Sequence, residues 1–144
     1  RSRQENPMIR TQTLVISAAI LSLAVTALPS RAAESARSVA TCKARSGQMF
    51  DALVKKDYGK ARAHFGTKMR KQFSVDRIRS VWNTLNKQAG AYKSRGLATA
   101  HAEKDFLLVS TPLKFVKGPV HAAVACDSKG RIIGLRLIPT GSAR

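Results

Sequence analysis

The spacing of apolar residues changes along this chain, and that change constrains the fold more than any other feature. In the first half of the chain, apolar residues recur every three or four positions, which places them on one face of a helix. This spacing predicts helices over about residues 38–57, 58–73 and 75–89. From residue 106 onward, apolar residues alternate with other residues, as in strands with one buried face. Three helices followed by a consecutive antiparallel sheet define an α+β class.

Local signals mark the ends of these predicted helices. Gly66 is expected to stop the second helix in a left-handed conformation, with one further turn after it. Ser74 is a good N-cap for the third helix, and Asp76 stands in its first turn, where the helix dipole favours a negative charge. Gly90 is expected to end that helix.

The strands are predicted from period-two patterns and from turn residues. Residues 91–102 are weakly patterned, and residues 106–116 and 120–126 alternate clearly, with turns at 117–119 and 127–130. Pro112 lacks an N–H group, which indicates an edge strand or a bulge. After the last turn, one face of a strand is expected to carry Ile133, Leu135 and Leu137.

The joint order of these features resembles a known family. The residues that carry the resemblance are Phe50, Leu53, Asp57, Tyr58, Ala61, Phe65, Met69, Trp82, Leu85, the segment Asp127–Leu135 and Pro139. They resemble a bacterial and archaeal domain-of-unknown-function family with a fold like nuclear transport factor 2. The resemblance implies a cone-shaped curved antiparallel sheet packed on three N-terminal helices. In that family the domain often precedes an α/β-hydrolase domain, but this sequence has no Gly-x-Ser-x-Gly nucleophile elbow, so no hydrolase activity carries over.

The N-terminal segment has the features of a secretory signal peptide. A short positive region at Met8–Arg10 precedes an apolar run over residues 14–28, and Ser30 and Ala32 are the small residues expected before a cleavage site. We therefore expect a leader over residues 1–32, with translation starting at Met8, and a single domain over residues 33–140 in the periplasm or outside the cell. An uncleaved N-terminal anchor is the alternative.

The chain is strongly basic. Its formal net charge is +18, and removal of a leader with four arginines and one glutamate would leave +15. Much of the charge falls in one stretch, which includes Lys55, Lys56, Lys60, Arg62, Lys68, Arg70 and Lys71. These residues form either a solvated helical face or a docking surface for anionic lipids or envelope polymers. No nucleic acid is expected as a partner, because the stretch lacks interleaved aromatic residues and no nucleic-acid motif occurs.

Residues suited to catalysis or to metal binding are scarce. None of the three histidines, His64, His101 and His121, has a second ligand at metal-site spacing, so no metal site and no cofactor are expected. His64 is expected to face solvent, while His101 or His121 could point into the cone. No catalytic residue is assigned.

A pocket between the helices and the sheet would be lined by Tyr58, Phe65, Trp82 and His121. We expect a non-enzymatic binding or interaction module, and a homodimer through the sheet is compatible with it. The alternative functions are a small pocket enzyme that uses Tyr58 and His121, and a basic binder of anionic envelope polymers. For the apolar members of this set a packed core is favoured over a pocket lining, and Trp82 is expected to dock near Leu113 and Phe115.

The sequence contains two cysteines, Cys42 and Cys126. In an oxidising compartment they allow a single disulfide connectivity. Both lie on the apolar face of their predicted elements, so they are candidates for one bridge. Two buried thiols that never meet are the alternative.

Overall fold

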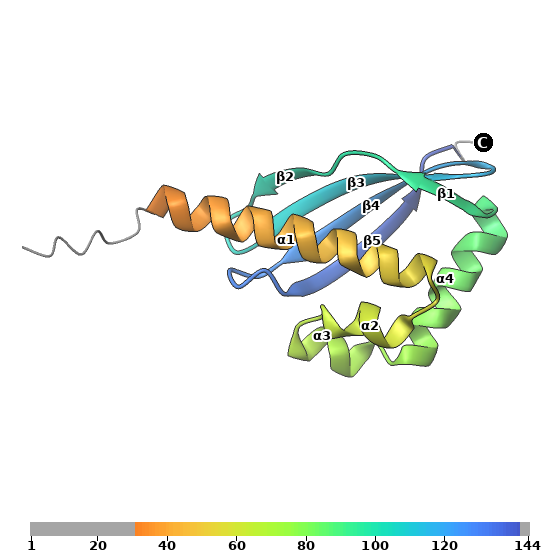
Figure 1. Ribbon diagram of the computed structural model, residues 1–144, viewed down its shortest axis with the longest axis horizontal. Coiled ribbons are helices and arrows are strands. Elements are labelled where there is room, and N and C mark those ends of the chain that lie inside the picture. Colours follow the sequence, from red (N-terminus) through yellow and green to blue (C-terminus); the bar gives the residue numbers. More distant parts are fainter. Residues whose placement is uncertain (1–30, 142–144) are drawn as a thin grey trace, which may run out of the picture.

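The computed structural model describes residues 31–141, which form four helices and one five-stranded sheet (Figure 1). The helices are α1 (Arg31–Val54), α2 (Tyr58–Ala63), α3 (Thr67–Gln72) and α4 (Val75–Ala89). The strands are β1 (Tyr92–Arg95), β2 (Thr99–Ala102), β3 (Leu107–Phe115), β4 (Gly118–Cys126) and β5 (Ile132–Pro139). All strand pairs within the sheet are antiparallel, and α1 lies across one face. The predicted α+β class is confirmed, and the sheet is open rather than closed on itself.

The predicted second helix is two helices, because Gly66 does not adopt a left-handed conformation. Its backbone is extended, with φ −66° and ψ 162°, and it is the N-cap residue of α3. The N–H of Gly66 donates to the carbonyl of Ile132 at 2.7 Å, and Phe65 forms a parallel bridge with the same residue. Residues 64–66 therefore run alongside the start of β5, and this pairing requires extended backbone.

Helix α1 ends at a lysine in a left-handed conformation. Lys56 has φ 60° and is the only non-glycine residue among the described ones with positive φ. The N–H of Asp57 donates to Ala52 at 2.8 Å, and the N–H of Lys56 donates to Leu53 at 3.0 Å. This pair of hydrogen bonds is a Schellman motif, in which the last helical carbonyls find donors beyond the helix. The motif turns the chain sharply into α2.

Helix α4 begins and ends where the sequence predicts. The hydroxyl oxygen of Ser74 accepts a hydrogen bond from the N–H of Arg77 at 3.2 Å, and Gly90 follows the last turn with φ 82°. Ile78, Trp82 and Leu85 are buried, but Val81, which was expected to share their face, is 42% exposed. Val81 lies at the border of the buried stripe.

Strand β3 is central, so the edge position predicted from Pro112 is wrong. It pairs with β4 along its whole length and with β1 and β2 on its other side. The carbonyl of Pro112 accepts from Gly96 at 2.7 Å, between the ends of β1 and β2. Because the N and O of one strand residue point the same way, the missing N–H of Pro112 faces the gap between those two strands. A proline therefore fits a central strand here.

A bulge in β5 corrects the predicted face of that strand. Cys126 pairs with Ile132 and Ala125 with Gly134, which leaves Ile133 as an extra residue. The bulge shifts the alternation by one position, so Ile132 is fully buried and Ile133 is 46% exposed. Leu135 is half-buried on the helix-facing side.

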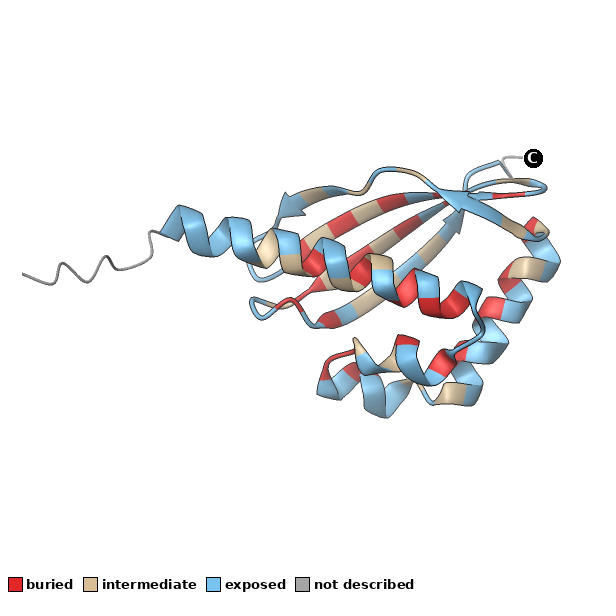
Figure 2. Cartoon of the chain, in the orientation of Figure 1, coloured by how far each residue is buried: buried red, intermediate tan, exposed pale blue. Residues whose placement is uncertain are grey.

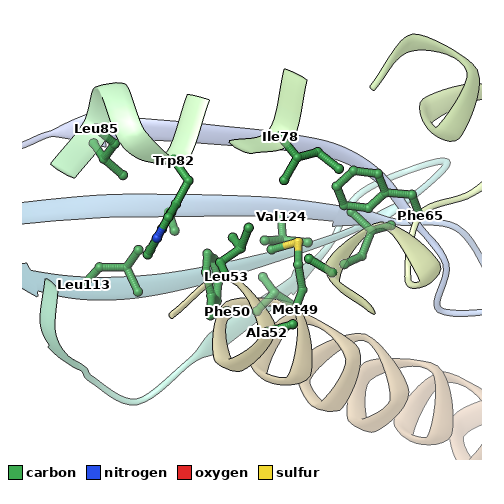
Figure 3. Packing of buried hydrophobic residues seen from close by; sticks show 14 of the residues in the cluster. Met49, Phe50, Ala52, Leu53, Phe65, Ile78, Trp82, Leu85, Leu113 and Val124 are labelled. Atoms are coloured by element: carbon green, nitrogen blue, oxygen red, sulfur yellow. The ribbon is translucent and has the colours of Figure 1, made fainter. Parts of the chain in front are cut away.

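The core lies between the sheet and the helices (Figure 2). α1 contributes Met49, Phe50 and Leu53, and the sheet contributes Val109, Leu113, Val120, Ala122 and Val124. Trp82 extends from α4 toward Leu113 on β3 (Figure 3). The helices cover one face of the sheet, and the outward-facing side chains of β4 include the exposed His121.

Cys42 and Cys126 form a disulfide that joins α1 to the end of β4, with a Cα–Cα distance of 6.0 Å. The following turn also docks on α1, where Ser38 donates to the carbonyl of Ser128 at 3.1 Å. Gly130 completes the turn with φ 72°, and a Cβ at this position would lie 2.6 Å from Cγ2 of Thr41. Both the backbone conformation and the close approach require glycine.

Candidate binding site

An apolar cavity lies between the helices and strand β5. Its volume is about 30 Å³. Nine residues line it: Leu53, Phe65, Met69, Phe73, Ile78, Val81, Trp82, Leu135 and Leu137. They come from α1, from residues 65–73, from α4 and from β5. We call these nine residues the apolar groove, because the cavity opens to solvent beside the partly exposed Val81, Phe73, Leu135 and Leu137.

The size and lining of the cavity limit what it can hold at rest. A dry cavity of about 150 Å³ is needed for a ligand such as benzene, whereas about 10–15 Å³ suffices for one water. The cavity of about 30 Å³ therefore fits the end of one small aliphatic group without rearrangement. None of its nine lining residues is ionisable, so the lining offers no group for acid–base chemistry.

The aromatic residues fix the shape of the groove. Trp82 is 4% exposed, and its ring centroid lies 6.0 Å from that of Phe115 and 6.2 Å from that of Tyr92. Phe65 meets Phe73 edge to face at 6.3 Å. The prediction that Trp82 docks against the sheet near Leu113 and Phe115 is confirmed (Figure 3).

The structure brings two of the four predicted pocket residues together. Phe65 and Trp82 both line the groove. Tyr58 is buried at the start of α2, where the guanidinium of Arg79 lies 5.5 Å from its ring centroid, but it does not line the groove. His121 is exposed on the sheet face that points away from the helices. Tyr58 and His121 therefore do not form the pair that the pocket-enzyme alternative requires, and His101, also exposed, does not point inward.

The basic stretch consists of residues with two different roles. Lys55, Lys56, Lys60, Lys68, Arg70 and Lys71 are exposed on the end of α1, its connection to α2, α2 and α3. Arg62 instead donates to the carbonyls of Phe73 at 2.9 Å and Arg70 at 2.8 Å, which satisfies acceptors at the C-terminal end of α3. The guanidinium of Arg62 is therefore held within the fold, although it keeps its positive charge.

A second, polar depression lies between α1 and α2. Its volume is about 520 Å³, and its wall includes Asp51, Lys60 and His64. Burial lowers the pKa of His64, and the positive charge of Arg45 lowers it further, so this half-buried histidine is not the solvent-facing residue that the sequence predicts. A hydrogen bond from Arg95 lowers the pKa of Asp51, although partial burial opposes that shift.

The two carboxylates of this depression already have partners within the fold. Asp51 pairs with Arg95 and so ties α1 to β1, and Asp57 accepts from the N–H of Lys60 at the start of α2. No group of three or more metal-ligating side chains occurs within residues 31–141. The carboxylates of this depression have structural roles, whereas no structural role accounts for the partly exposed apolar side chains of the groove. We therefore take the apolar groove as the candidate site.

Helices packed on one face of an open antiparallel sheet define this protein as an α+β domain with an apolar groove between its two layers. The chain belongs to the family described as "Protein of unknown function (DUF3887)", whose model matches residues 46–135. The matched segment runs from the middle of α1 to Leu135 in the groove.

The fold is similar to that of a solved structure. An NMR structure of a protein from Ruminococcus gnavus ATCC 29149 matches with a TM-score of 0.50 and 16% sequence identity, covering 67% of this chain and 87% of that one. No curated protein matches the chain. Among the helices of residues 31–141, none is both long enough and apolar enough to cross a membrane.

Proposed function

We propose that this protein is an exported binding module without catalytic activity, and that the apolar groove holds an apolar group of its ligand. The observation that carries this proposal is the lining of the groove, which is entirely apolar yet partly open to solvent at Val81, Leu135 and Leu137. A concave site lined by apolar side chains can receive an apolar group of a ligand. General acid–base catalysis would need an ionisable group facing the ligand, and the lining has none.

The proposal includes the finer features of the fold and of the export signal. The order of the helices and strands supports a cone-shaped arrangement like that of nuclear transport factor 2, with the groove in the position of the cone's interior. Residues 1–30 of the predicted leader lie outside the described residues, and Arg31 and Ala32 are the first residues of α1. Removal of residues 1–32 would leave the domain of residues 33–140 with its groove complete.

The groove can be tested with anilinonaphthalene sulfonate, an apolar anion that fluoresces on contact with apolar surface. Because the cavity is too small for its rings, the dye is expected to lie over the open side of the groove, beside Val81, Leu135 and Leu137. Trp82 is the only tryptophan in the sequence and lines the groove, so dye bound there should emit when the tryptophan is excited. Val81→Asp places a charge in the groove wall and should weaken dye binding about tenfold or more, which corresponds to about 1.4 kcal/mol.

Val54→Asp is the matched control for this experiment. Val54 is 41% exposed, Val81 is 42% exposed, and Val54 lies outside the groove but near Trp82. The control variant should bind the dye as the wild type does. Equal losses in the two variants, or no sensitised emission in the wild type, would count against the groove.

A second candidate function is a weak docking surface for anionic lipids or polymers. The exposed lysines and Arg70 on α2, α3 and the connection between α1 and α2 favour it, because no acidic side chain pairs with Lys56, Lys60, Lys68, Arg70 or Lys71 among the described residues. Binding to vesicles that contain phosphatidylglycerol should fade as salt rises, because exposed charges are screened beyond about 8–10 Å at physiological salt. Binding that does not change with salt, or with Lys68, Arg70 and Lys71 all replaced by Ser, would exclude this surface.

A further inference from the structure

Strand β5 is an edge of the sheet, and most of that edge is free. β5 pairs only with β4, because the strand order is β1-β3-β4-β5 with β2 beside β3. Only the start of β5 has a neighbour on its other side, where Ile132 accepts from Gly66 at 2.7 Å and donates to His64 at 3.0 Å. After the bulge at Ile133, the chain runs unpaired on this side to Pro139.

The backbone groups at this free edge belong to two residues of the apolar groove. The N–H of Thr140 donates to Pro119 on β4 at 2.9 Å, so Thr140 faces β4. Because successive strand residues turn their N–H and C=O groups to opposite sides, Leu135 and Leu137 direct theirs away from β4. These two donors and two acceptors have no hydrogen-bond partner among residues 31–141. The side chains of the same two leucines form one wall of the groove.

A free strand edge beside an apolar groove is the geometry that binds an extended peptide. An added strand satisfies the edge with main-chain hydrogen bonds, and every second side chain of that strand enters the pockets beside the edge. The cavity of about 30 Å³ suits the end of one aliphatic side chain and is too small for a ring without rearrangement. Both observations favour a peptide over a compact small molecule.

The charges around the groove indicate the chemistry of the peptide. Neither α3 nor β5 contains an acidic residue, and the one in α4, Asp76, is paired with Arg79. The guanidinium of Arg77 lies 5.2 Å from the ring centroid of Phe73 in the groove wall, and Arg136 is exposed on β5 itself. A segment with acidic side chains would complement these cations. A second copy of this chain would instead bring Arg136 and a net charge of the same sign to the same edge.

We propose that β5 binds an extended acidic segment of a partner protein. The segment adds a strand at Leu135 and Leu137, and its alternate apolar side chains lie in the apolar groove. This inference rests on the proposed function and names its ligand class.

The probe is a blocked seven-residue peptide, Asp-Val-Glu-Val-Asp-Val-Glu, added to the protein purified from its host. Its binding should slow hydrogen exchange at the amides of Leu135 and Leu137, the two donors that face outward, and should change the emission of Trp82. Two N-methylated versions of this peptide cover both registers of pairing. One has methylated amides at its valines, and the other has methylated amides at its acidic residues. Because a methylated amide cannot donate, at least one of the two should bind tenfold more weakly or worse. A peptide with Lys in place of Asp and Glu should also bind at least tenfold more weakly.

Two protein variants supply a matched comparison. Leu137→Pro removes an outward-facing donor and part of the groove wall without removing a hydrogen bond to β4, since proline is tolerated where the N–H of an edge strand faces solvent. Ile138→Ala changes the neighbouring side chain, which is 43% exposed and does not line the groove. Leu137→Pro should bind the peptide at least tenfold more weakly, and Ile138→Ala should bind it as the wild type does. If Leu137→Pro does not fold, the comparison of the methylated peptides with the parent peptide still tests strand addition.

The remaining outcomes separate the two proposals. If the dye binds at the groove but no peptide protects Leu135 and Leu137, or if both methylated peptides bind as well as the parent, strand addition is wrong while the binding groove stands. Protection of these amides that grows with protein concentration in the absence of peptide would show that a second copy is the occupant and would overturn the acidic partner. If neither dye nor peptide binds, the proposed function itself is wrong.

Discussion

At the scale of single residues, the end of α1 depends on Lys56 in a conformation that costs free energy. Its φ of 60° is unfavourable for a residue with a Cβ, and glycine adopts it without that penalty. We expect Lys56→Gly to raise the free energy of unfolding by about 0.5–1 kcal/mol, the left-handed penalty being offset in part by the greater entropy of glycine in the unfolded chain. Urea denaturation measures the change. Lys60→Gly, inside α2, is the control and should be destabilising.

A second residue-scale prediction concerns the turn between β4 and β5. Partial burial raises the pKa of Asp127, but hydrogen bonds from the N–H and the guanidinium of Arg131 and from the N–H of Lys129 outweigh it and hold the pKa below the usual 3.8. Because the folded-state pKa is lowered, this contribution to stability is present above about pH 4 and is lost as the pH falls through the folded-state pKa.

Asp127→Asn should therefore reduce the loss of stability on acidification below pH 4, and it should lower stability at neutral pH because the ion pair with Arg131 is lost. Urea titrations at a series of pH values test this expectation. Asp105→Asn, at an exposed position between β2 and β3, should leave the pH profile unchanged. Identical profiles for Asp127→Asn and the wild type would contradict the assigned role of the carboxylate.

Single residues were predictable from the sequence where the cause is local. The N-cap at Ser74 and the stop at Gly90 depend on their own helix, so the helical pattern was sufficient to place them. Gly66 and Lys56 were not predictable in this way. The extended backbone of Gly66 comes from pairing with Ile132, far along the chain, and a lysine at a left-handed helix end has no sequence signature.

At the scale of elements, α1 is held to the sheet by the disulfide and by the turn that follows β4. The cysteines are 84 positions apart, so the disulfide closes a long loop. In the chain-entropy model, a disulfide that closes a loop of this length restricts the unfolded chain and so contributes about 4–5 kcal/mol to stability. We expect the double variant Cys42→Ala/Cys126→Ala to lose a similar free energy of unfolding in urea denaturation.

Mass spectrometry without reductant provides the control for this prediction. The protein purified from its host should contain no thiol that reacts with an alkylating reagent. Two freely alkylated cysteines would contradict the bridge. A double variant as stable as the wild type would show that the disulfide, although formed, does not stabilise the fold.

The positions of the helices and strands along the sequence were largely predictable, but which strands pair with one another was not. Apolar periodicity alone located α4, β3 and β4 because each buries one regular face. The central position of β3 and the bulge at Ile133 depend on which strands pair, and alternation within one strand carries no such information. The shift of Ile132 into the core follows from that bulge.

At the scale of the whole molecule, the candidate site arises where separate elements meet. The sequence placed Phe65 and Trp82 in a pocket because both are large apolar residues on helical faces. His121 lies on the face of β4 opposite Val120 and Ala122, as alternation along the strand already indicates. The position of Tyr58 outside the groove follows instead from how α2 packs on the other elements, which the sequence does not show. The partial exposure of Val81 beside Leu135 and Leu137 could not be predicted from the sequence either, since it results from the packing of α4 against β5.

The export proposal is also a property of the whole chain. If the leader is removed after Ala32, the intact mass of the protein from its host should correspond to a chain that starts at Ala33. The mature protein should occur in the periplasm or in the medium. Full-length protein that stays in the cytoplasm would contradict export, although it would leave the groove unaffected.

The decisive measurement is the mapping of backbone amide shifts by NMR as the acidic peptide or the dye is titrated into the protein. Binding at the apolar groove should move the signals of Phe73, Val81, Leu135 and Leu137 together, and it should leave His121 on the far face of the sheet unchanged. Shifts that centre on His121, or that are confined to the lysines of α2 and α3, would contradict a binding site between α3, α4 and β5.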